Sequence, residues 1–206
     1  MTGRVRLKMC GMTRREDIDA AVSLGVDAIG LIFHPESPRA VSIEDAEALL
    51  DNLPPFASVV AVLVNPLAAF VERLLQTVNV QFLQFHGEES DSFCRQFNRP
   101  FIKTLAATSA VEILEEARRY PSACALLLDT PSALRGGSGL AFDWGAVPRT
   151  LPKPLILAGG LTAQNVQEGI RVCAPFAVDV CSGIEASKGV KSPVKMQEFV
   201  KTMWGA

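Results

Sequence analysis

The stretch LILAGGLTAQNVQEGIRVCAPFAVDVCSGIE, residues 155–185, decides the fold. It predicts a strand at 155–158, a glycine turn, a helix at 162–172, a second strand at 177–180 and a turn of small residues. Turns rich in Gly and Ser leave backbone N–H groups accessible to an anion, and a helix that starts nearby adds its positive dipole end. Any βα unit needs turn glycines, but two such turns in succession suggest a phosphate site like that after strands 7 and 8 of a (β/α)₈ barrel. The predicted phosphate-binding residues are Gly159, Gly160, Ser182 and Gly183.

The same alternation of short apolar runs and helical patterns extends back to the N-terminus. Strands are expected at 5–10, 28–33, 57–64, 81–85, 101–105, 125–129, 155–158 and 177–180. Helices are expected at 15–24, 43–50, 66–78, 90–97, 110–120, 143–147, 162–172 and 193–204. Continuously apolar strands indicate a parallel sheet covered on both faces. We therefore predict a single α/β domain over residues 1–206, a (β/α)₈ TIM barrel with eight parallel strands.

An open doubly wound sheet of the flavodoxin or Rossmann type is the alternative fold. No GxGxxG motif follows the first strand, which disfavours a dinucleotide site. We expect no cofactor.

Composition restricts the class of protein and its partners. The chain has 206 residues, 49% of them hydrophobic and 20% charged, which is typical of a globular protein. A net charge of −2 gives no general attraction to nucleic acid or to an anionic membrane. The N-terminus lacks the apolar core of a signal peptide, and the five cysteines form no CxxC pair. These features predict a cytoplasmic protein with reduced thiols that binds neither nucleic acid nor membrane. With two distant histidines, we expect no metal site.

Two residues at predicted strand ends could transfer protons, because the active site of such a barrel lies where its strands end. Cys10 ends the first strand and precedes Gly11, so nearby helix-terminal N–H groups would favour a thiolate. Asp129 ends an apolar strand, where a carboxyl group would be partly desolvated and available as an acid. Each residue alone could be structural, the cysteine as core filling and the aspartate as a loop cap. Together at one opening they form an acid/base pair.

Six motifs in order then resemble those of the phosphoribosylanthranilate isomerase family. They are KMCGMT at 8–13, HPESPR at 34–39, QFHGE at 84–88, GGSG at 136–139 before FDW at 142–144, AGGL at 158–161 and DVCSGIE at 179–185. The resemblance covers residues 7 to about 200. Cys181 stands where the family often has Ser, and Met9 and Met12 replace other apolar residues.

The resemblance implies an Amadori rearrangement, the third step of tryptophan synthesis from chorismate. N-(5-phosphoribosyl)anthranilate would become 1-(o-carboxyphenylamino)-1-deoxyribulose 5-phosphate without a metal or redox cofactor. Asp129 is implied as the acid that protonates the furanose ring oxygen, and Cys10 as the base that removes the proton from C2. The expected partner is this small phosphorylated substrate, with the protein a monomer or a homodimer.

The resemblance also assigns substrate contacts. Arg39 would bind the anthranilate carboxylate, since a guanidinium pairs with planar carboxylates through two hydrogen bonds. Asp179 would bind sugar hydroxyls, and Gln84 would help to orient the substrate. His86 is either a substrate contact or a residue that fixes its loop, and residues 135–139 could form a lid over the phosphate side.

Related phosphate-binding barrels are the rival enzymes. A histidine-pathway isomerase should have Asp where this chain has Cys10, and a pentulose-phosphate epimerase should supply paired His and Asp metal ligands. The tryptophan synthase α-subunit is longer and uses carboxylates for both proton transfers. A barrel kept only as a scaffold would have lost Cys10 or Asp129, and both are present.

Strand alternation makes one further prediction. If Cys10 faces the barrel interior then Lys8 does too, while Leu7 and Met9 face the helices. A buried lysine needs a partner, and barrel closure brings the eighth strand beside the first. We therefore expect Lys8 to pair with Asp179 and to favour the Cys10 thiolate.

Overall fold

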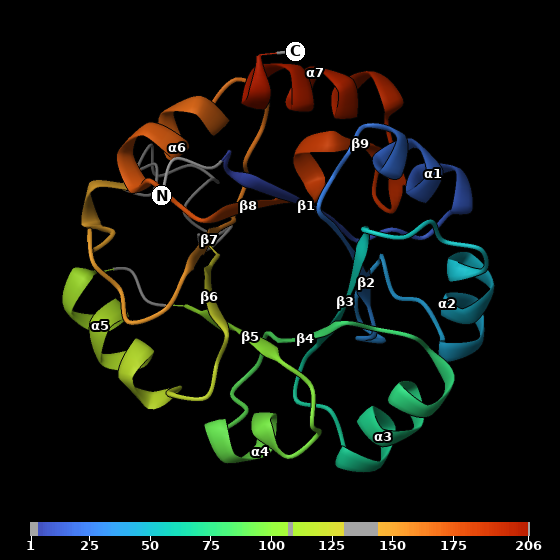
Figure 1. The fold of residues 1–206 in the computed structure, drawn as a ribbon, viewed down its shortest axis with the longest axis horizontal. Coiled ribbons are helices and arrows are strands. Elements are labelled where there is room, and N and C mark those ends of the chain that lie inside the picture. Colours follow the sequence, from blue (N-terminus) through green and yellow to red (C-terminus); the bar gives the residue numbers. More distant parts are fainter. Residues whose placement is uncertain (1–3, 107–108, 130–143, 206) are drawn as a thin grey trace.

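Eight parallel strands close into a barrel in the order β1 to β8, as the sequence predicts (Figure 1). The computed structural model describes residues 4–106, 109–129 and 144–205. The strands are β1 Arg6–Cys10, β2 Ala28–Ile32, β3 Ser58–Leu63, β4 Phe82–Phe85, β5 Phe101–Leu105, β6 Ala125–Leu128, β7 Leu155–Leu157 and β8 Ala177–Val180. Each pairs in parallel with the next, and β8 pairs with β1. The open-sheet alternative is therefore wrong.

Helices surround the barrel on its outside (Figure 1). They are α1 Arg15–Ser23, α2 Ile43–Leu50, α3 Ala68–Thr77, α4 Asp91–Arg95, α5 Ala110–Arg119, α6 Val166–Cys173 and α7 Pro193–Trp204. Two short 3₁₀ helices, η2 Trp144–Ala146 and η3 Ser182–Ile184, follow β6 and β8 in the chain. The side chain of Ser42 caps α2, as expected from its place before Ile43.

Two helices begin later than the sequence pattern predicts, because in each case the side chain of an asparagine near the expected start forms hydrogen bonds within the preceding loop or turn or to a neighbouring loop. Asn65 takes φ of 44°, its side chain accepts a hydrogen bond from Glu88 N at 2.8 Å, and α3 starts only at Ala68. Asn165 accepts from Thr162 N and donates to Gly160 O, which makes residues 162–165 a turn before α6. The N-terminus of α6 therefore does not directly follow the glycine turn.

The apolar side chains form two layers, one on each side of the strands. The larger layer lies between the strands and the helices and includes Leu7 and Met9. The smaller layer fills the barrel interior and is formed by Val60, Ile102, Ala125, Leu127, Ile156, Ala158 and Ala177. Because neighbouring side chains of a strand point to opposite faces, Lys8 and Cys10 of β1 belong to the interior. This confirms the predicted orientation of β1.

Lys8 and Asp179 form a buried ion pair inside the barrel, which confirms the predicted partnership. They are register partners across the β1–β8 seam, and Lys8 Nζ lies 2.8 Å from Asp179 Oδ2. Burial alone would lower the pKa of the Lys8 amine, but the attraction of Asp179 and of Cys10 raises it above its ordinary value. Lys8 is therefore charged, and the closing seam of the barrel contains one matched pair of charges.

A small antiparallel hairpin after β8 was not expected from the sequence. It consists of β9 Glu185–Ser187 and β10 Val190–Lys191, and it lies between η3 and α7. Gly189 forms its turn with φ of 81°. The two strands are too short to show an alternation of apolar and polar residues, so the sequence pattern does not predict them.

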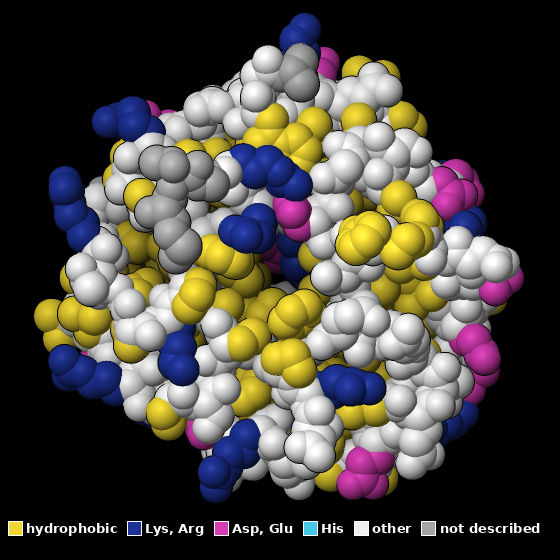
Figure 2. Space-filling view, viewed as in Figure 1, with side chains coloured by type: hydrophobic (Ala, Val, Ile, Leu, Met, Phe, Trp, Pro, Cys, Tyr) yellow, Lys and Arg dark blue, Asp and Glu magenta, His cyan; other side chains and the backbone are white. Residues whose placement is uncertain are grey.

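The face of the molecule in Figure 2 has charged side chains of both signs around a central hollow with many hydrophobic side chains.

Two local contacts involve arginines near the N-terminus. Arg4 pairs with Asp27 at 2.7 Å, and Arg6 stacks over Phe176 at 4.3 Å. In the part of the chain that is described, no helix combines the length and the apolar character needed to span a membrane.

The buried pair leads to a stability prediction. Lys8→Met should lower the free energy of unfolding by about 3–5 kcal/mol, because it leaves Asp179 as an unpaired buried charge. The double variant Lys8→Met/Asp179→Leu should regain part of that loss, since no buried charge remains. Urea unfolding of the wild type and the variants measures both effects. A double variant no more stable than Lys8→Met would contradict this account of the seam.

Candidate active site

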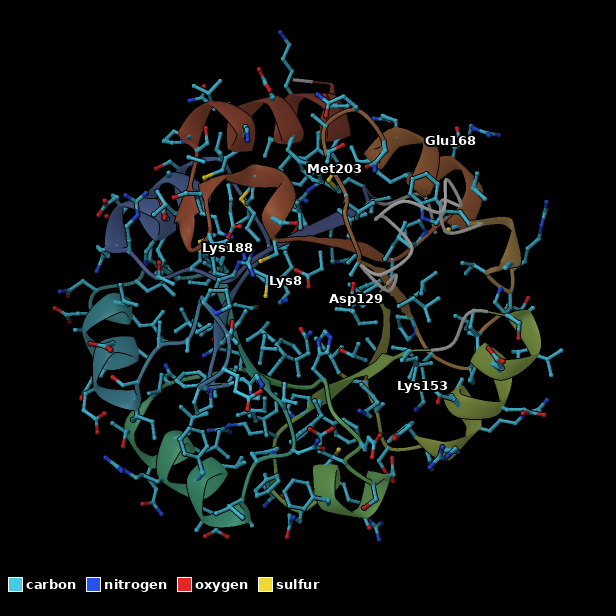
Figure 3. The ribbon with its side chains drawn as sticks, turned by 180° about the vertical axis from the view of Figure 1, so that it is seen from behind. Lys8, Asp129, Lys153, Glu168, Lys188 and Met203 are labelled. Carbon is cyan, nitrogen blue, oxygen red and sulfur yellow. The ribbon has the colours of Figure 1, made fainter. Side chains whose placement is uncertain are left out.

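A cavity of about 840 Å³ lies at the ends of the strands and gathers most of the predicted site residues. Its lining includes Cys10, Arg39, Gln84, His86, Asp129, Gly159, Gly160, Asp179 and Ser182. In Figure 3, Lys8 and Asp129 lie at the central opening of the barrel. The one predicted residue outside the lining is Gly183.

Cys10 is a buried thiol, and the structure corrects the expectation that it is a thiolate. Burial raises the pKa of Cys10 to about 12, and the neighbouring charge of Lys8 lowers it by less than burial raises it. The direction of the predicted Lys8 effect is therefore right, but desolvation outweighs it. Gly30 on β2 makes room for the sulfur, because a Cβ there would lie 2.7 Å from Cys10 Sγ.

Asp129 follows β6 across the cavity from Cys10, and His86 contacts it. Its side chain is 39% exposed, and Oδ2 lies 3.3 Å from His86 Nε2. The other ring nitrogen, Nδ1, lies 3.4 Å from the amide nitrogen of Gln84 and 3.3 Å from the hydroxyl of Thr104. Because an amide nitrogen only donates, Nδ1 accepts, and Nε2 carries the hydrogen that faces Asp129.

Two buried acceptors at this cavity have no partner among the described residues. They are Gln84 Oε1 and Asp179 Oδ1, and both residues line the cavity. An acceptor buried without a donor is costly, so each is suited to a hydroxyl or amine that a ligand would bring. The second oxygen of Asp179 is already used by Lys8.

The loop that carries His86 is fixed by a second buried ion pair. Lys103 on β5 lies 3.1 Å from Glu89 and also donates to the carbonyl oxygens of Phe85 and Gly87. Glu89 in turn accepts from the backbone N–H groups of Asn65 and Gly87. The ion pair therefore orders both ends of the segment around His86.

Arg39 is neither a solvated loop arginine nor an unpartnered cation. Its Nε and Nη2 donate to the two carboxylate oxygens of Glu185, each at 2.7 Å, and its side chain is only 18% exposed. Hydrogen bonding to Glu185 raises the pKa of the guanidinium. Gly11, with φ of 72°, lies against it, because a Cβ at Gly11 would be 2.7 Å from Arg39 Cδ.

The two small-residue turns lie together on one side of the cavity. Gly159 and Gly160 both take positive φ, 80° and 58°, which residues with a Cβ rarely adopt. Gly183 permits a close approach of the two turns, since a Cβ there would lie 1.9 Å from Leu161 O. Gly183 thus packs the β8 turn against the β7 turn.

The proposed lid at 135–139 lies outside the described residues. Within the described ranges, no group of three or more His, Cys, Asp or Glu side chains could hold a metal ion.

Sequence reasoning missed several residues that support the site. They are Glu89, Lys103, Thr104, Glu185 and Lys191, all of them buried. Lys103 and Thr104 stand in a predicted apolar strand, and a charged residue there was the one available signal. Glu185 was part of a quoted motif but had no assigned role.

The protonation state of Cys10 can be tested directly. At neutral pH the Cys10 thiol should be protonated, because its pKa is raised to about 12, and Lys8→Met should raise that pKa further. Thiolate ultraviolet absorbance, taken as the difference between wild type and Cys10→Ser across pH, isolates this group from the other four cysteines. A Cys10-dependent transition near neutral pH would show that burial does not dominate.

Comparisons with known proteins agree on one family. The family model described as N-(5'phosphoribosyl)anthranilate (PRA) isomerase matches residues 7–202. The chain is 57% identical to N-(5'-phosphoribosyl)anthranilate isomerase of Legionella pneumophila (strain Corby), over 98% of both chains. Phosphoribosyl anthranilate isomerase from Thermotoga maritima matches with a TM-score of 0.90, 37% identity and 98% and 100% coverage. A solved phosphoribosyl anthranilate isomerase in complex with reduced 1-(o-carboxyphenylamino)-1-deoxyribulose 5-phosphate matches with a TM-score of 0.85, 34% identity and the same coverage. The chain therefore belongs to the N-(5'-phosphoribosyl)anthranilate isomerase family.

Proposed function

We propose that the cavity at the strand ends is where this isomerase converts N-(5-phosphoribosyl)anthranilate into 1-(o-carboxyphenylamino)-1-deoxyribulose 5-phosphate, with Asp129 as acid and Cys10 as base. The observation that carries the assignment is that both residues line one cavity, Asp129 just after β6 and Cys10 at the end of β1. Both groups suit the two proton transfers that an Amadori rearrangement needs.

Asp129 would give its proton to the furanose ring oxygen, and the ring would open to a Schiff base. The hydrogen on His86 Nε2 faces Asp129 Oδ2 and would hold the carboxyl group in place while its other oxygen reaches the substrate. His86 would thus orient the acid, and its place in the cavity lining also favours a contact with the ligand.

Cys10 would then remove the proton from C2 of the sugar, giving an enolamine that tautomerises to the ketone. A thiol with a pKa of about 12 is not ionised at neutral pH in the free enzyme. Ring opening places a positive iminium group in the same buried cavity, and an adjacent cation favours the thiolate. The iminium charge and Lys8 would therefore stabilise the thiolate that forms when Cys10 releases its S–H proton to water, and this thiolate would take the C2 proton.

The anchoring groups divide the substrate into three parts. Arg39 would bind the anthranilate carboxylate, and the unpartnered oxygens of Gln84 and Asp179 would accept from sugar hydroxyls. The turns at Gly159, Gly160 and Ser182 would bind the phosphate, with Gly183 holding them together. No metal or cofactor is needed for these steps.

The five free cysteines support a reducing compartment, and we infer a cytoplasmic enzyme. Whether it is a monomer or a homodimer stays a prediction. The overall proposal is tested by adding chemically generated phosphoribosylanthranilate to the protein and following the decay of substrate fluorescence. A decay no faster than that without protein would contradict the proposed reaction.

The acid and the base lead to a prediction about turnover. Cys10→Ala and Asp129→Asn should each fold and yet lose at least about 10²-fold in kcat, which is typical of losing a general acid or base. Fluorescence-monitored kinetics, with circular dichroism as the folding control, measure this. Near-normal turnover in either folded variant would remove that residue from its role.

Arg39 leads to a prediction about affinity. Arg39→Ala should weaken binding of the reduced product analogue, because the carboxylate loses its guanidinium partner. An analogue without the carboxyl group should bind wild type and variant almost equally. Calorimetric titration of both ligands gives the comparison, and equal losses for the two ligands would mean that Arg39 acts only on the structure.

A further inference from the structure

The β9–β10 hairpin stands beside Arg39 and contributes nothing to the barrel sheet itself. Several hydrogen bonds join it to the rest of the protein. Lys191 N donates to the buried carboxylate of Asp17 at 3.1 Å, Thr13 Oγ1 donates to Gly189 O, and Lys195 Nζ donates to Glu185 O at 2.7 Å. Lys188 marks the hairpin turn in Figure 3. The hairpin is thus attached at several points and holds two buried charged side chains, Glu185 and Lys191.

Glu185 is the central group, because two cations share its carboxylate. Oε1 accepts from Arg39 Nε at 2.7 Å, from Lys191 Nζ at 3.1 Å and from Gly189 N at 3.2 Å, while Oε2 accepts from Arg39 Nη2. Burial raises the pKa of this carboxyl, but Arg39 and Lys191 lower it more, so the net pKa lies below its ordinary value. Glu185 is therefore ionised at neutral pH.

The hydrogen bonds to Glu185 leave one edge of the guanidinium open. A guanidinium presents five N–H groups, and Glu185 takes only those on the Nε/Nη2 side. Within the described residues, Nη1 has no hydrogen-bond partner, and Arg39 lines the cavity. The Nη1/Nη2 edge can therefore pair with a second carboxylate in the plane that Glu185 defines.

Charge decides whether that edge attracts an anion. Arg39 and Glu185 alone would form a neutral pair, with little net attraction for another carboxylate. Lys191, with a side chain 0% exposed, adds the second positive charge, so the trio carries one net positive charge. Its amine also donates to Cys181 O at 3.2 Å, which holds it at the base of the β8 turn.

We propose that Glu185 and Lys191 are positioning residues for carboxylate recognition. Glu185 sets the plane of the Arg39 guanidinium, and Lys191 cancels the charge of Glu185 so that Arg39 stays attractive to an anion. The inference rests on the proposed binding of the anthranilate carboxylate by Arg39. It gives the hairpin a role in substrate selection, since ligands with and without the carboxylate are then distinguished by two residues that touch neither.

The test compares two ligands, the reduced product analogue and the same compound without its carboxyl group. Lys191→Met should weaken binding of the first by roughly tenfold or more, as expected for a lost charge-assisted contact, and leave the second unchanged. Lys188→Met is the matched control, because it removes a lysine from the same hairpin at an exposed position, and both affinities should stay at wild-type values.

Glu185→Gln separates orientation from charge. This variant increases the net positive charge but weakens the hold on the guanidinium, so the carboxylate ligand should bind more weakly than to wild type. Tighter binding would show that charge alone governs recognition and would overturn the orienting role of Glu185. If Lys191→Met does not fold, Lys191→Met/Glu185→Gln, which leaves no unpaired buried charge at the hairpin, takes its place. Because Lys191 then has no Glu185 charge to cancel, the double variant should bind the carboxylate ligand about as Glu185→Gln does, and a clear further loss would overturn the charge-cancelling role of Lys191.

Arg39→Ala separates the proposed role of Arg39 in carboxylate binding from the proposed roles of Glu185 and Lys191. If this variant keeps full discrimination between the ligands, the proposed role of Arg39 fails and the inference fails with it. If Arg39→Ala loses discrimination but Lys191→Met and Glu185→Gln both keep it, Arg39 binds the carboxylate without help from the hairpin, and only the further inference is overturned.

Discussion

The structure depends on the pairing of its first strand with its last. Parallel strands close into a barrel only if β8 meets β1, and here that seam includes a lysine and an aspartate at the same register. Removing two charges from water is expensive, and here the amine of Lys8 and one carboxylate oxygen of Asp179 compensate each other, while the other oxygen of Asp179 has no partner among the described residues. The Lys8–Asp179 pair fixes the closing register and also forms the floor beneath Cys10.

Further buried ion pairs lie around the opening of the barrel. Besides Lys8, the buried lysines Lys103 and Lys191 each meet a glutamate near a strand end, one beneath the His86 loop and one beneath Arg39. Each cluster fixes a loop that carries a proposed functional side chain. The loops of a barrel are otherwise its least constrained parts. A buried, hydrogen-bonded ion pair at the base of a loop fixes the loop in one orientation, whereas a hydrophobic contact does not depend on direction.

The barrel and most of the cavity lining could be predicted from the sequence, since both follow from periodicity. Alternation along β1 placed Lys8 and Cys10 inside, and closure named Asp179 as the partner. The protonation state of a buried group could not be predicted from periodicity in the same way. The pKa of Cys10 depends on how far desolvation, which raises it, exceeds the effect of the Lys8 charge, which lowers it. The sequence alone does not give the depth of burial that sets the desolvation. The hairpin was missed because strands of three and two residues show no period.

The contact between Gly183 and Leu161 has a consequence for how the family can change. With 1.9 Å between a hypothetical Cβ and a backbone oxygen, no side chain can be added at position 183 while the β7 turn stays in place. Any larger residue at 183 requires the β7 turn to retreat, which would move the backbone at Gly160 as well. Selection or laboratory evolution that puts a side chain at position 183 therefore has to change the β7 turn together with the β8 turn.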